Sequence, residues 1–177
     1  MHSPARLTLE RQILPYFASL GSVRRVLFVG CAWYTWRYSF WFSSRGREYW
    51  TMELVADRAR KYGGPNAIAD SFSHLDRHFP GDHFDLIVCN GVIGWGLDDP
   101  AEVERTFEQC RLALTPGGVF VLGWNDVEGH RPVDVASSPA LGRLRPFTLP
   151  TLSAARYDTV GKDGRAFVFN FYERPRP

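Results

Sequence analysis

Hydrophobic and polar positions along the chain change between a helical and an extended period, and these changes predict its elements. Leu9, Ile13 and Phe17 recur at helical spacing, which predicts a short amphipathic helix that Gly21 ends. Residues 24–30 follow, with four consecutive apolar positions between arginine and glycine, as expected for a buried strand. The chain therefore begins with a helix that leads into a first strand.

Strand-like and helix-like stretches continue to alternate after this first pair. Further strands are expected at 48–54, 67–71, 84–90 and 119–124. Helices are expected at 33–44, 55–64 and 100–114, and a turn at 115–118. The segment 126–148 is polar and irregular, and 155–175 reads as two strands about the hairpin turn of Lys162, Asp163 and Gly164.

This repeated alternation predicts an α/β fold, a doubly wound and mostly parallel sheet with helices on both faces. The terminal hairpin adds an antiparallel strand at the far edge. Neither a repeat nor a linker interrupts the sequence, so residues 1–177 are expected to form one domain. Within it, 1–23 hold the N-terminal helix, 24–124 the core, and 125–177 a lid segment and the hairpin.

Composition restricts the class of protein. The chain has 177 residues, of which 45% are hydrophobic and 23% charged, as in a folded globular domain. Its net charge of +2 gives no reason to expect a nucleic-acid or membrane partner. The charge is unevenly spread, because residues 1–62 carry ten Lys and Arg against four Asp and Glu, whereas 63–128 carry three against eleven.

The three cysteines, Cys31, Cys89 and Cys110, form an odd set without a CxxC spacing. This argues against a disulfide framework or a zinc site, and for a reducing, cytoplasmic location. No apolar run approaches the ~20 residues of a membrane-spanning helix. The N-terminus also lacks the apolar stretch of a signal peptide.

Four of the predicted strands end in residues suited to holding a ligand. In doubly wound sheets, ligands bind at the carboxyl ends of strands, near the point where the strand order reverses. Gly30 ends the first strand, and Glu53 ends the second at about the distance where an acidic residue grips ribose hydroxyls. The third strand ends in Asp70 and Ser71, and the fourth in Asn90 and Gly91.

A long stretch adds a more specific signal, reading FPGDHFDLIVCNGVIGW at 79–95 and DDPAEVERTFEQCRLALTPGGVFVLGWND at 98–126. Its strand, helix, L-x-P-G-G turn and following strand resemble those of small class I S-adenosylmethionine-dependent methyltransferases. The resemblance covers about 24–124, and the terminal hairpin is similar to the family's last two strands. It implies a Rossmann-like fold, S-adenosylmethionine as cofactor, a small-molecule acceptor and, as a further option, a homodimer.

The resemblance also implies a role for each matching residue. The backbone of Gly30, Cys31 and Ala32 is expected to pass the methionine part of the cofactor. Glu53 is expected to hold the ribose hydroxyls, with Leu54 against the adenine. Asp70 would accept from the adenine amino group with Ser71 beside it, and the methionine end would be lined by Asn90, Gly91 and Val92.

The turn after the first strand departs from the family pattern. The usual acidic residue is Phe28 here, and the second and third glycines are Ala32 and Tyr34. Trp33 and Tyr34 lie in the turn, where an aromatic face can stabilise a sulfonium. Two other interpretations stay open: an inactive methyltransferase-like binding protein with its cofactor space filled by Phe28, Trp33 and Tyr34, or a nicotinamide-dependent oxidoreductase lacking the G-x-G-x-x-G fingerprint.

Several side chains allow both a functional and a plain structural interpretation. Trp95 is expected to stack on the acceptor, or else to lie in a flexible loop. His130 and Asp126 are candidates for a base that deprotonates the acceptor, with an ordinary surface position as the alternative. By the same reasoning, Glu53 could be a solvated carboxylate, Asp70 and Ser71 a helix cap, and Asn90 and Gly91 a plain turn.

Two further sets of residues carry structural expectations. His74 and His78 lie four positions apart without a third ligand, so no metal site is predicted. Trp36, Phe40 and Trp41 are expected to pack the helix at 33–44 onto the sheet.

Overall fold

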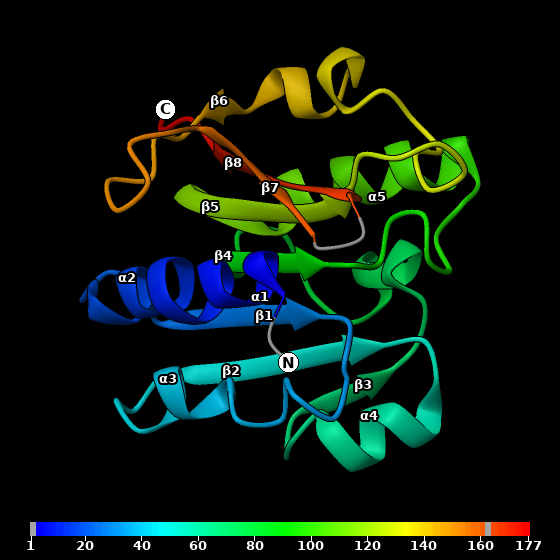
Figure 1. Cartoon of the computed structure of the whole chain (residues 1–177). Coiled ribbons are helices and arrows are strands. Elements are labelled where there is room, and N and C mark those ends of the chain that lie inside the picture. The colour runs from blue at the N-terminus through cyan, green and yellow to red at the C-terminus, as the bar shows by residue number, and fades with distance from the viewer. Residues whose placement is uncertain (1–2, 162–163) are drawn as a thin grey trace.

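The computed structural model describes residues 3–161 and 164–177, which form one sheet of eight strands (Figure 1). The strands are β1 (Arg25–Val29), β2 (Glu48–Glu53), β3 (Ala67–Ala69), β4 (Phe84–Asn90), β5 (Leu114–Asn125), β6 (Arg145–Pro146), β7 (Arg156–Val160) and β8 (Ala166–Glu173). Their order is β3-β2-β1-β4-β5-β8-β6, and β7 also pairs with β8. Pairing is parallel from β3 through β5, whereas β8 runs antiparallel to β5, β6 and β7.

The N-terminal helix comprises α1 (Pro4–Thr8), a π-helical stretch (Leu9–Ile13) and α2 (Leu14–Ser19). The other helices are α3 (Ser39–Ser43), α4 (Ala56–Tyr62) and α5 (Pro100–Ala113), with 3₁₀ turns at Phe72–Arg77, Val135–Ser137 and Leu141–Arg143. Asp99 caps α5, because its carboxylate accepts a hydrogen bond from the backbone N–H of Glu102 at 2.9 Å.

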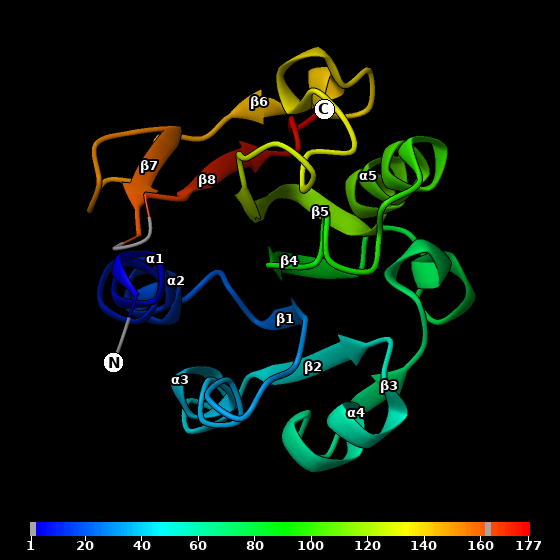
Figure 2. The same cartoon turned by 45° about the vertical axis from the view of Figure 1, so that its right-hand side comes forward.

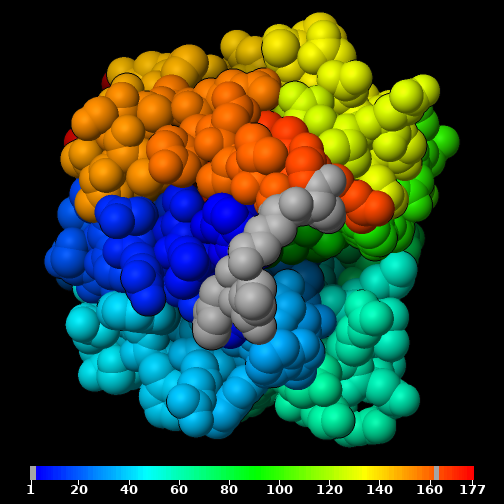
Figure 3. All heavy atoms as spheres, in the orientation of Figure 1, coloured from blue at the N-terminus to red at the C-terminus, as the bar shows by residue number. Residues whose placement is uncertain are grey.

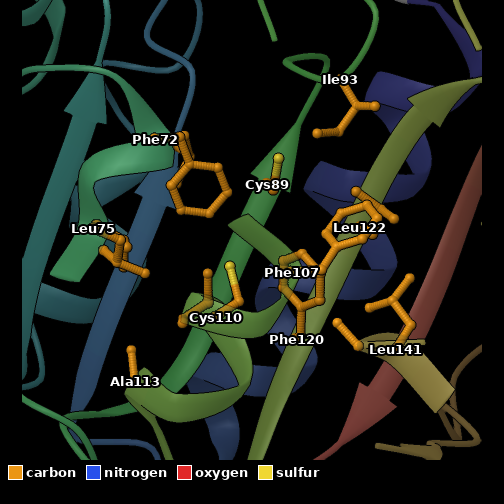
Figure 4. Close-up of a cluster of buried hydrophobic side chains, with 14 of the residues drawn as sticks. Phe72, Leu75, Cys89, Ile93, Phe107, Cys110, Ala113, Phe120, Leu122 and Leu141 are labelled. Carbon is orange, nitrogen blue, oxygen red and sulfur yellow. The ribbon is translucent and has the colours of Figure 1, made fainter. Parts of the chain in front are cut away.

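Neighbouring residues of each central strand face opposite sides of the sheet and build two cores. Leu27 of β1 joins the core under α5, whereas Val26 and Phe28 join the core under the N-terminal helix and α3. Figure 2 shows α1, α2 and α3 on one side of the sheet and α5 on the other. In Figure 4, Phe107 and Cys110 of α5 lie against residues of β4 and β5 in the first core.

The observed sheet confirms the predicted fold class and most of the predicted elements. β4 has the predicted bounds, and α5 begins at the predicted Pro100. The segment 126–148 contains only two 3₁₀ turns and the short β6. The hairpin of β7 and β8 is also present, although Lys162 and Asp163 of its predicted turn lie outside the described residues.

Two strands differ from the prediction. β5 begins at Leu114, because Gly117 donates to the carbonyl of Arg174 at 2.8 Å and Arg174 donates to the carbonyl of Gly118 at 2.9 Å. The predicted turn 115–118 is therefore part of the ladder. β8 does not lie at the far edge, because β6 and β7 both pair with its outer side.

The predicted helix at 33–44 is wrong for most of its length. Only α3 is helical, and the residues before it form successive turns. Trp36 and Phe40 do not pack onto the sheet, since 46% and 62% of their surfaces are exposed. The buried contacts come instead from Tyr38 and Phe42, with Trp41 only partly buried.

Among the described residues, no helix combines the length and the apolar character that crossing a membrane requires.

Candidate functional site

A pocket opens at the carboxyl ends of β1, β2, β3 and β4, where the strand order reverses between β1 and β4. In Figure 1 the arrowheads of β1, β2 and β4 point toward this edge of the sheet, on the right. The pocket contains about 710 Å³ of space not filled by atoms, its open mouth included.

The chain leaves β1 through a position that only glycine suits. Gly30 has φ +92°, and a Cβ atom there would lie 3.0 Å from both the carbonyl oxygen of Asn90 and Cγ2 of Val92. The turn beyond it is closed by Thr35, whose hydroxyl accepts from the N–H of Ala32 and donates to the carbonyl of Ala32. The turn is therefore ordered although the later glycines of the family are missing.

Tyr34 lines the pocket at the position of the family's third glycine, and the N-terminal helix holds its ring. The guanidinium carbon of Arg6 lies 4.5 Å from the centroid of the Tyr34 ring. Glu10 accepts hydrogen bonds from Arg6 at 2.7 Å and from the hydroxyl of Tyr38 at 2.9 Å. These contacts fix Tyr34 along one wall and leave the pocket open.

Glu53, at the end of β2, bridges the turn after β1 and the turn after β2 on the pocket floor. Its Oε2 accepts from the backbone N–H of Cys31 at 2.7 Å, and its Oε1 accepts from the N–H of Val55 at 3.0 Å. Glu53 is 8% exposed, yet it lines the pocket. An ionised carboxylate has about four acceptor sites, so each oxygen keeps one for a ligand.

Asp70, which follows β3, accepts more hydrogen bonds than Glu53 does. Oδ1 accepts from Nδ1 of His74 at 2.8 Å and from the N–H of Ser71 at 2.7 Å, and Oδ2 accepts from Nε2 of His78 at 2.8 Å. These donors hold the pKa of Asp70 well below its usual range. Only Oδ2 retains an acceptor site for a ligand.

Asn90 and Gly91 form the opposite wall, where β4 meets β5. Gly91 donates to the carbonyl of Gly123 at 2.8 Å. A Cβ atom on Gly123 would lie 2.6 Å from Oδ1 of Asn90, so the missing side chain at 123 makes room for the amide.

Cys31, which also lines the pocket, is buried, and burial raises the pKa of its thiol to about 11.

The loop after β4 is attached to the loop after β5. The rings of Trp95 and His130 are stacked 4.0 Å apart, Nδ1 of His130 donates to the carbonyl of Gly94 at 2.8 Å, and the Trp95 indole donates to Oδ1 of Asn125 at 2.9 Å. Trp95 lines the pocket and is 53% exposed. One face of its indole is covered by His130, and the rest stays accessible.

The structure brings nearly all of the predicted site residues to one place. The predicted residues that line the pocket are Gly30, Cys31, Ala32, Tyr34, Glu53, Leu54, Asp70, Ser71, Asn90, Gly91, Val92 and Trp95. Trp33, His130 and Asp126 are not among its lining residues. Asp126 instead pairs with Arg131 at 2.9 Å and with Arg156 at 3.0 Å.

Six lining residues were not predicted from the sequence, namely Val29, Met52, Arg58, Phe72, Gly96 and Leu97. Val29 and Met52 directly precede predicted site residues, and their position at the ends of β1 and β2 was a usable signal. Arg58 comes from α4 and Phe72 from the turn after β3, and nothing in their local sequence marks them. No group of three or more His, Cys, Asp or Glu residues in the described part of the chain could hold a metal ion.

Comparison with known families decides the relationship. The family model described as "Methyltransferase domain" matches residues 27–122, more than half of the chain. The chain belongs to this family, the class I S-adenosylmethionine-dependent methyltransferases. The matched region runs from β1 into β5 and so includes the four strands that form the pocket of this methyltransferase-family protein.

Solved structures share the fold at low sequence identity. N-methyltransferase NodS from Bradyrhizobium japonicum WM9, in complex with S-adenosyl-L-homocysteine, is 16% identical with a TM-score of 0.66, over 98% of this chain and 93% of that one. A SAM-dependent methyltransferase from Archaeoglobus fulgidus is 16% identical with a TM-score of 0.60, over 94% and 91%. The Burkholderia thailandensis 1,6-didemethyltoxoflavin-N1-methyltransferase is 16% identical with a TM-score of 0.56, over 95% and 81%. No curated protein sequence matches the chain.

Proposed function

We propose that the protein transfers the methyl group of S-adenosylmethionine to a small-molecule acceptor. One observation carries this proposal: the open pocket at the ends of β1 to β4 is lined by every predicted cofactor residue except Trp33. Membership of the methyltransferase family supports the same reaction.

The free acceptor sites of the pocket suit an adenosyl group. Glu53 keeps one free site on each carboxylate oxygen, which matches the two neighbouring hydroxyls of a ribose. Leu54 is 56% exposed at the pocket rim and offers an apolar surface to an adenine. Asp70 is a weaker partner for an amino group than the family pattern implies, because only its Oδ2 has a free site.

Bound S-adenosylmethionine supplies a methyl group on a positively charged sulfur, which needs no further activation. The protein's own residues then have two tasks, to align the acceptor with that methyl group and to exclude water. The turn from Gly30 to Tyr34 and the wall from Asn90 to Val92 enclose the methionine end of the pocket in this proposal. Trp95 forms the edge against which an acceptor lies.

The proposed base is the least supported part of the sequence prediction. Both carboxylate oxygens of Asp126 pair with arginines, which leaves it poorly placed to take a proton. Nδ1 of His130 donates to the carbonyl of Gly94, and its ring stacks on Trp95. His130 therefore contacts a residue of the pocket wall without lining the pocket itself. We infer that His130 positions Trp95 and that the reaction does not require it as a base.

A small acceptor agrees with the names of two structural relatives. NodS is an N-methyltransferase, and the Burkholderia thailandensis enzyme was crystallised with 1,6-didemethyltoxoflavin, a small molecule. An inactive protein with a filled cofactor site is less well supported. Phe28 is buried in the core against Tyr38, and Trp33 is 66% exposed and outside the lining. Of the three rings expected to fill the site, only Tyr34 lines the pocket.

Calorimetric titration of the purified protein with S-adenosylmethionine and S-adenosylhomocysteine tests the proposal. We expect micromolar affinity that falls at least about ten-fold in Glu53→Ala, because a charged hydrogen-bond acceptor is worth ~1.5–3 kcal/mol. Glu48→Ala removes a carboxylate at the exposed start of the same strand and should bind as the wild type does. Absence of heat and of a thermal shift at millimolar ligand would refute the proposal, and binding of a nicotinamide dinucleotide instead would favour an oxidoreductase.

A further inference from the structure

Three large aromatic side chains project from the segment between β1 and β2 without covering any core. Trp33, Trp36 and Phe40 are 66%, 46% and 62% exposed. Single exposed apolar residues are common on protein surfaces, but a cluster of large ones marks a contact surface. We refer to these three residues as the aromatic stripe. None of them lines the pocket described above.

The backbone places the stripe on one face of the segment. Thr35 donates to the carbonyl of Ala32 and Tyr38 to that of Thr35, so two successive turns have a period of three residues. Residues three apart in such turns lie on the same side, which aligns Trp33 with Trp36. The rings of Trp36 and Phe40 then contact each other edge to face, with centroids 6.5 Å apart.

The opposite face of the same segment supplies the buried contacts. Thr35, Tyr38 and Phe42 are each no more than 5% exposed, and Tyr38 packs edge to face on Phe28 of β1. The segment is therefore aromatic on both faces, whereas a surface segment ordinarily carries polar residues on its outer face. Packing of the core accounts for the buried rings of Tyr38 and Phe42. It does not account for the exposed rings of the stripe.

The segment that carries the stripe has charges of one sign only. Residues 31–47 contain three arginines and no aspartate or glutamate. The guanidinium of Arg37 lies 4.8 Å from the centroid of the Trp36 ring, and among the described residues no carboxylate pairs with it. The guanidinium carbon of Arg6 lies 5.3 Å from the centroid of Trp33, but Arg6 is paired with Glu10 and adds no net charge. The near-neutral charge of the whole chain conceals this basic, aromatic surface.

We propose that the aromatic stripe docks the protein onto the surface of an anionic phospholipid bilayer. Tryptophan favours the boundary between headgroups and acyl chains, where an apolar ring and a polar edge are both accommodated. Arginine binds phosphate oxygens through its planar fork. The basic, acid-free segment complements the negative surface of such a bilayer. This proposal departs from the expectation, drawn from net charge, that no membrane takes part.

Two other occupants fit the observations less well. A symmetric dimer across the stripe would join two surfaces that both carry Arg37 and Arg45, and residues 31–47 supply no carboxylate to pair with them. A protein partner requires a rim of varied hydrogen-bonding groups, whereas the exposed side chains from 33 to 45 offer only rings, serine hydroxyls and guanidiniums.

The segment lies at the surface, next to the pocket. Figure 3 shows its light-blue atoms at the lower front of the molecule, between the dark-blue N-terminal helix and the teal residues around α4. Tyr34, between Trp33 and Trp36 in sequence, lines the pocket. Docking through the stripe would thus bring the pocket close to the bilayer.

Co-sedimentation of the full chain with lipid vesicles tests the proposal. One set of vesicles is phosphatidylcholine alone, and the other contains about one third phosphatidylglycerol. We expect binding to the anionic vesicles only, weakened by salt, with a blue shift of tryptophan fluorescence. Trp36→Ser and Phe40→Ser should each weaken binding about ten-fold, since each removes one large ring that the bilayer would bury. Arg37→Gln should weaken it about five-fold.

Leu112→Ser and Val160→Ser serve as matched controls, because both residues are exposed apolar side chains outside the segment, 46% and 61% exposed. They should bind vesicles as the wild type does. The proposal is overturned if neither vesicle binds, if both bind equally, or if the stripe variants bind normally. It is also overturned if the stripe variants only abolish a dimer seen by light scattering. Because vesicle binding needs no cofactor, its failure would not affect the proposed methyl transfer, which calorimetry tests separately.

Discussion

The imidazole of His130 lies parallel to the indole of Trp95, with ring centroids 4.0 Å apart and planes inclined by 10°. The two residues come from different loops, one after β4, which ends at the pocket, and the other after β5. Gly94 strengthens the junction, because its carbonyl accepts from Nδ1 of His130 at 2.8 Å. A residue outside the pocket therefore determines how a pocket residue is held.

Replacing His130 should loosen this junction without unfolding the domain. In His130→Ala, both the stacked pair and the hydrogen bond to Gly94 are lost, which we expect to lower the free energy of unfolding by about 1–2 kcal/mol. Thermal unfolding should show a decrease in Tm of roughly 2–8 °C for a chain of this size.

His130→Phe separates the two contributions, because it keeps an aromatic ring on Trp95 and removes only the hydrogen bond. Its Tm should fall between those of the wild type and His130→Ala. Cofactor affinity, measured by calorimetry, should change less than two-fold in both variants, as expected from a side chain that does not line the pocket. If either variant loses cofactor binding altogether, His130 has a direct role that its position does not explain.

The close approach at Gly94 predicts a larger effect. Gly94 has φ +78°, and a Cβ atom there would lie 2.1 Å from the carbonyl oxygen of His130. Gly94→Ala should therefore destabilise the protein by about 3 kcal/mol or more, from steric overlap and left-handed strain together. Urea unfolding followed by circular dichroism measures the difference.

Gly46→Ala is the matched control for this prediction. Gly46 has φ +69°, but a Cβ atom there would meet no other atom within 4 Å, so only the backbone strain applies. We expect Gly46→Ala to lower the free energy of unfolding by about 1 kcal/mol. Equal losses in the two variants would mean that the contact between Gly94 and His130 is not tight in solution.

The sheet could be predicted from sequence because its signals are local. Four consecutive apolar residues identified β1, and Pro100 identified the start of α5. The candidate site followed from topology, because Gly30 and Glu53 end parallel neighbouring strands and so must lie close together. Both inferences needed only periodicity and the rule for where such sheets bind ligands.

Other features were not predictable from local signals. In the segment after β1, aromatic residues occupy both faces, so the apolar period could not show that Tyr38 and Phe42 face inward while Trp36 and Phe40 face outward. Arg58 reaches the pocket only because α4 turns back along β2 and β3. The stacking of two residues 35 positions apart (130 minus 95) likewise depends on how two loops meet in space.

Glu53 offers a sharper test of the pocket floor than removal of its side chain. In Glu53→Gln the shape is kept, but one oxygen becomes an NH₂ group that must face the N–H of Cys31 or Val55. Two donors then oppose each other, and one acceptor for a ribose hydroxyl is lost. We expect S-adenosylmethionine to bind about 10- to 100-fold more weakly by calorimetry. Unchanged affinity would show that Glu53 does not contact the cofactor.

The contacts of Asp70 predict a pH dependence of stability. His74, His78 and the N–H of Ser71 keep the pKa of Asp70 below that of an aspartate in the unfolded chain, which is about 3.9. Between the folded and unfolded pKa values the unfolded chain binds the proton more readily, so stability falls as pH decreases through this window. The full contribution of Asp70 is present above about pH 4 and is lost progressively below it.

Asp70→Asn measures this contribution, because it removes the charge and keeps the shape. In urea unfolding at roughly pH 6 the variant should be less stable than the wild type, by about 1–2 kcal/mol for charge-assisted hydrogen bonds at a partly exposed site. The difference should shrink as pH is lowered to about 3, because the wild-type carboxylate then takes up a proton in the unfolded chain. Asp57→Asn, at an exposed site on α4, should show little difference at either pH. If the difference in free energy of unfolding between Asp70→Asn and the wild type stays constant from pH ~6 to ~3, the assignment of the two imidazoles as donors to Asp70 is wrong.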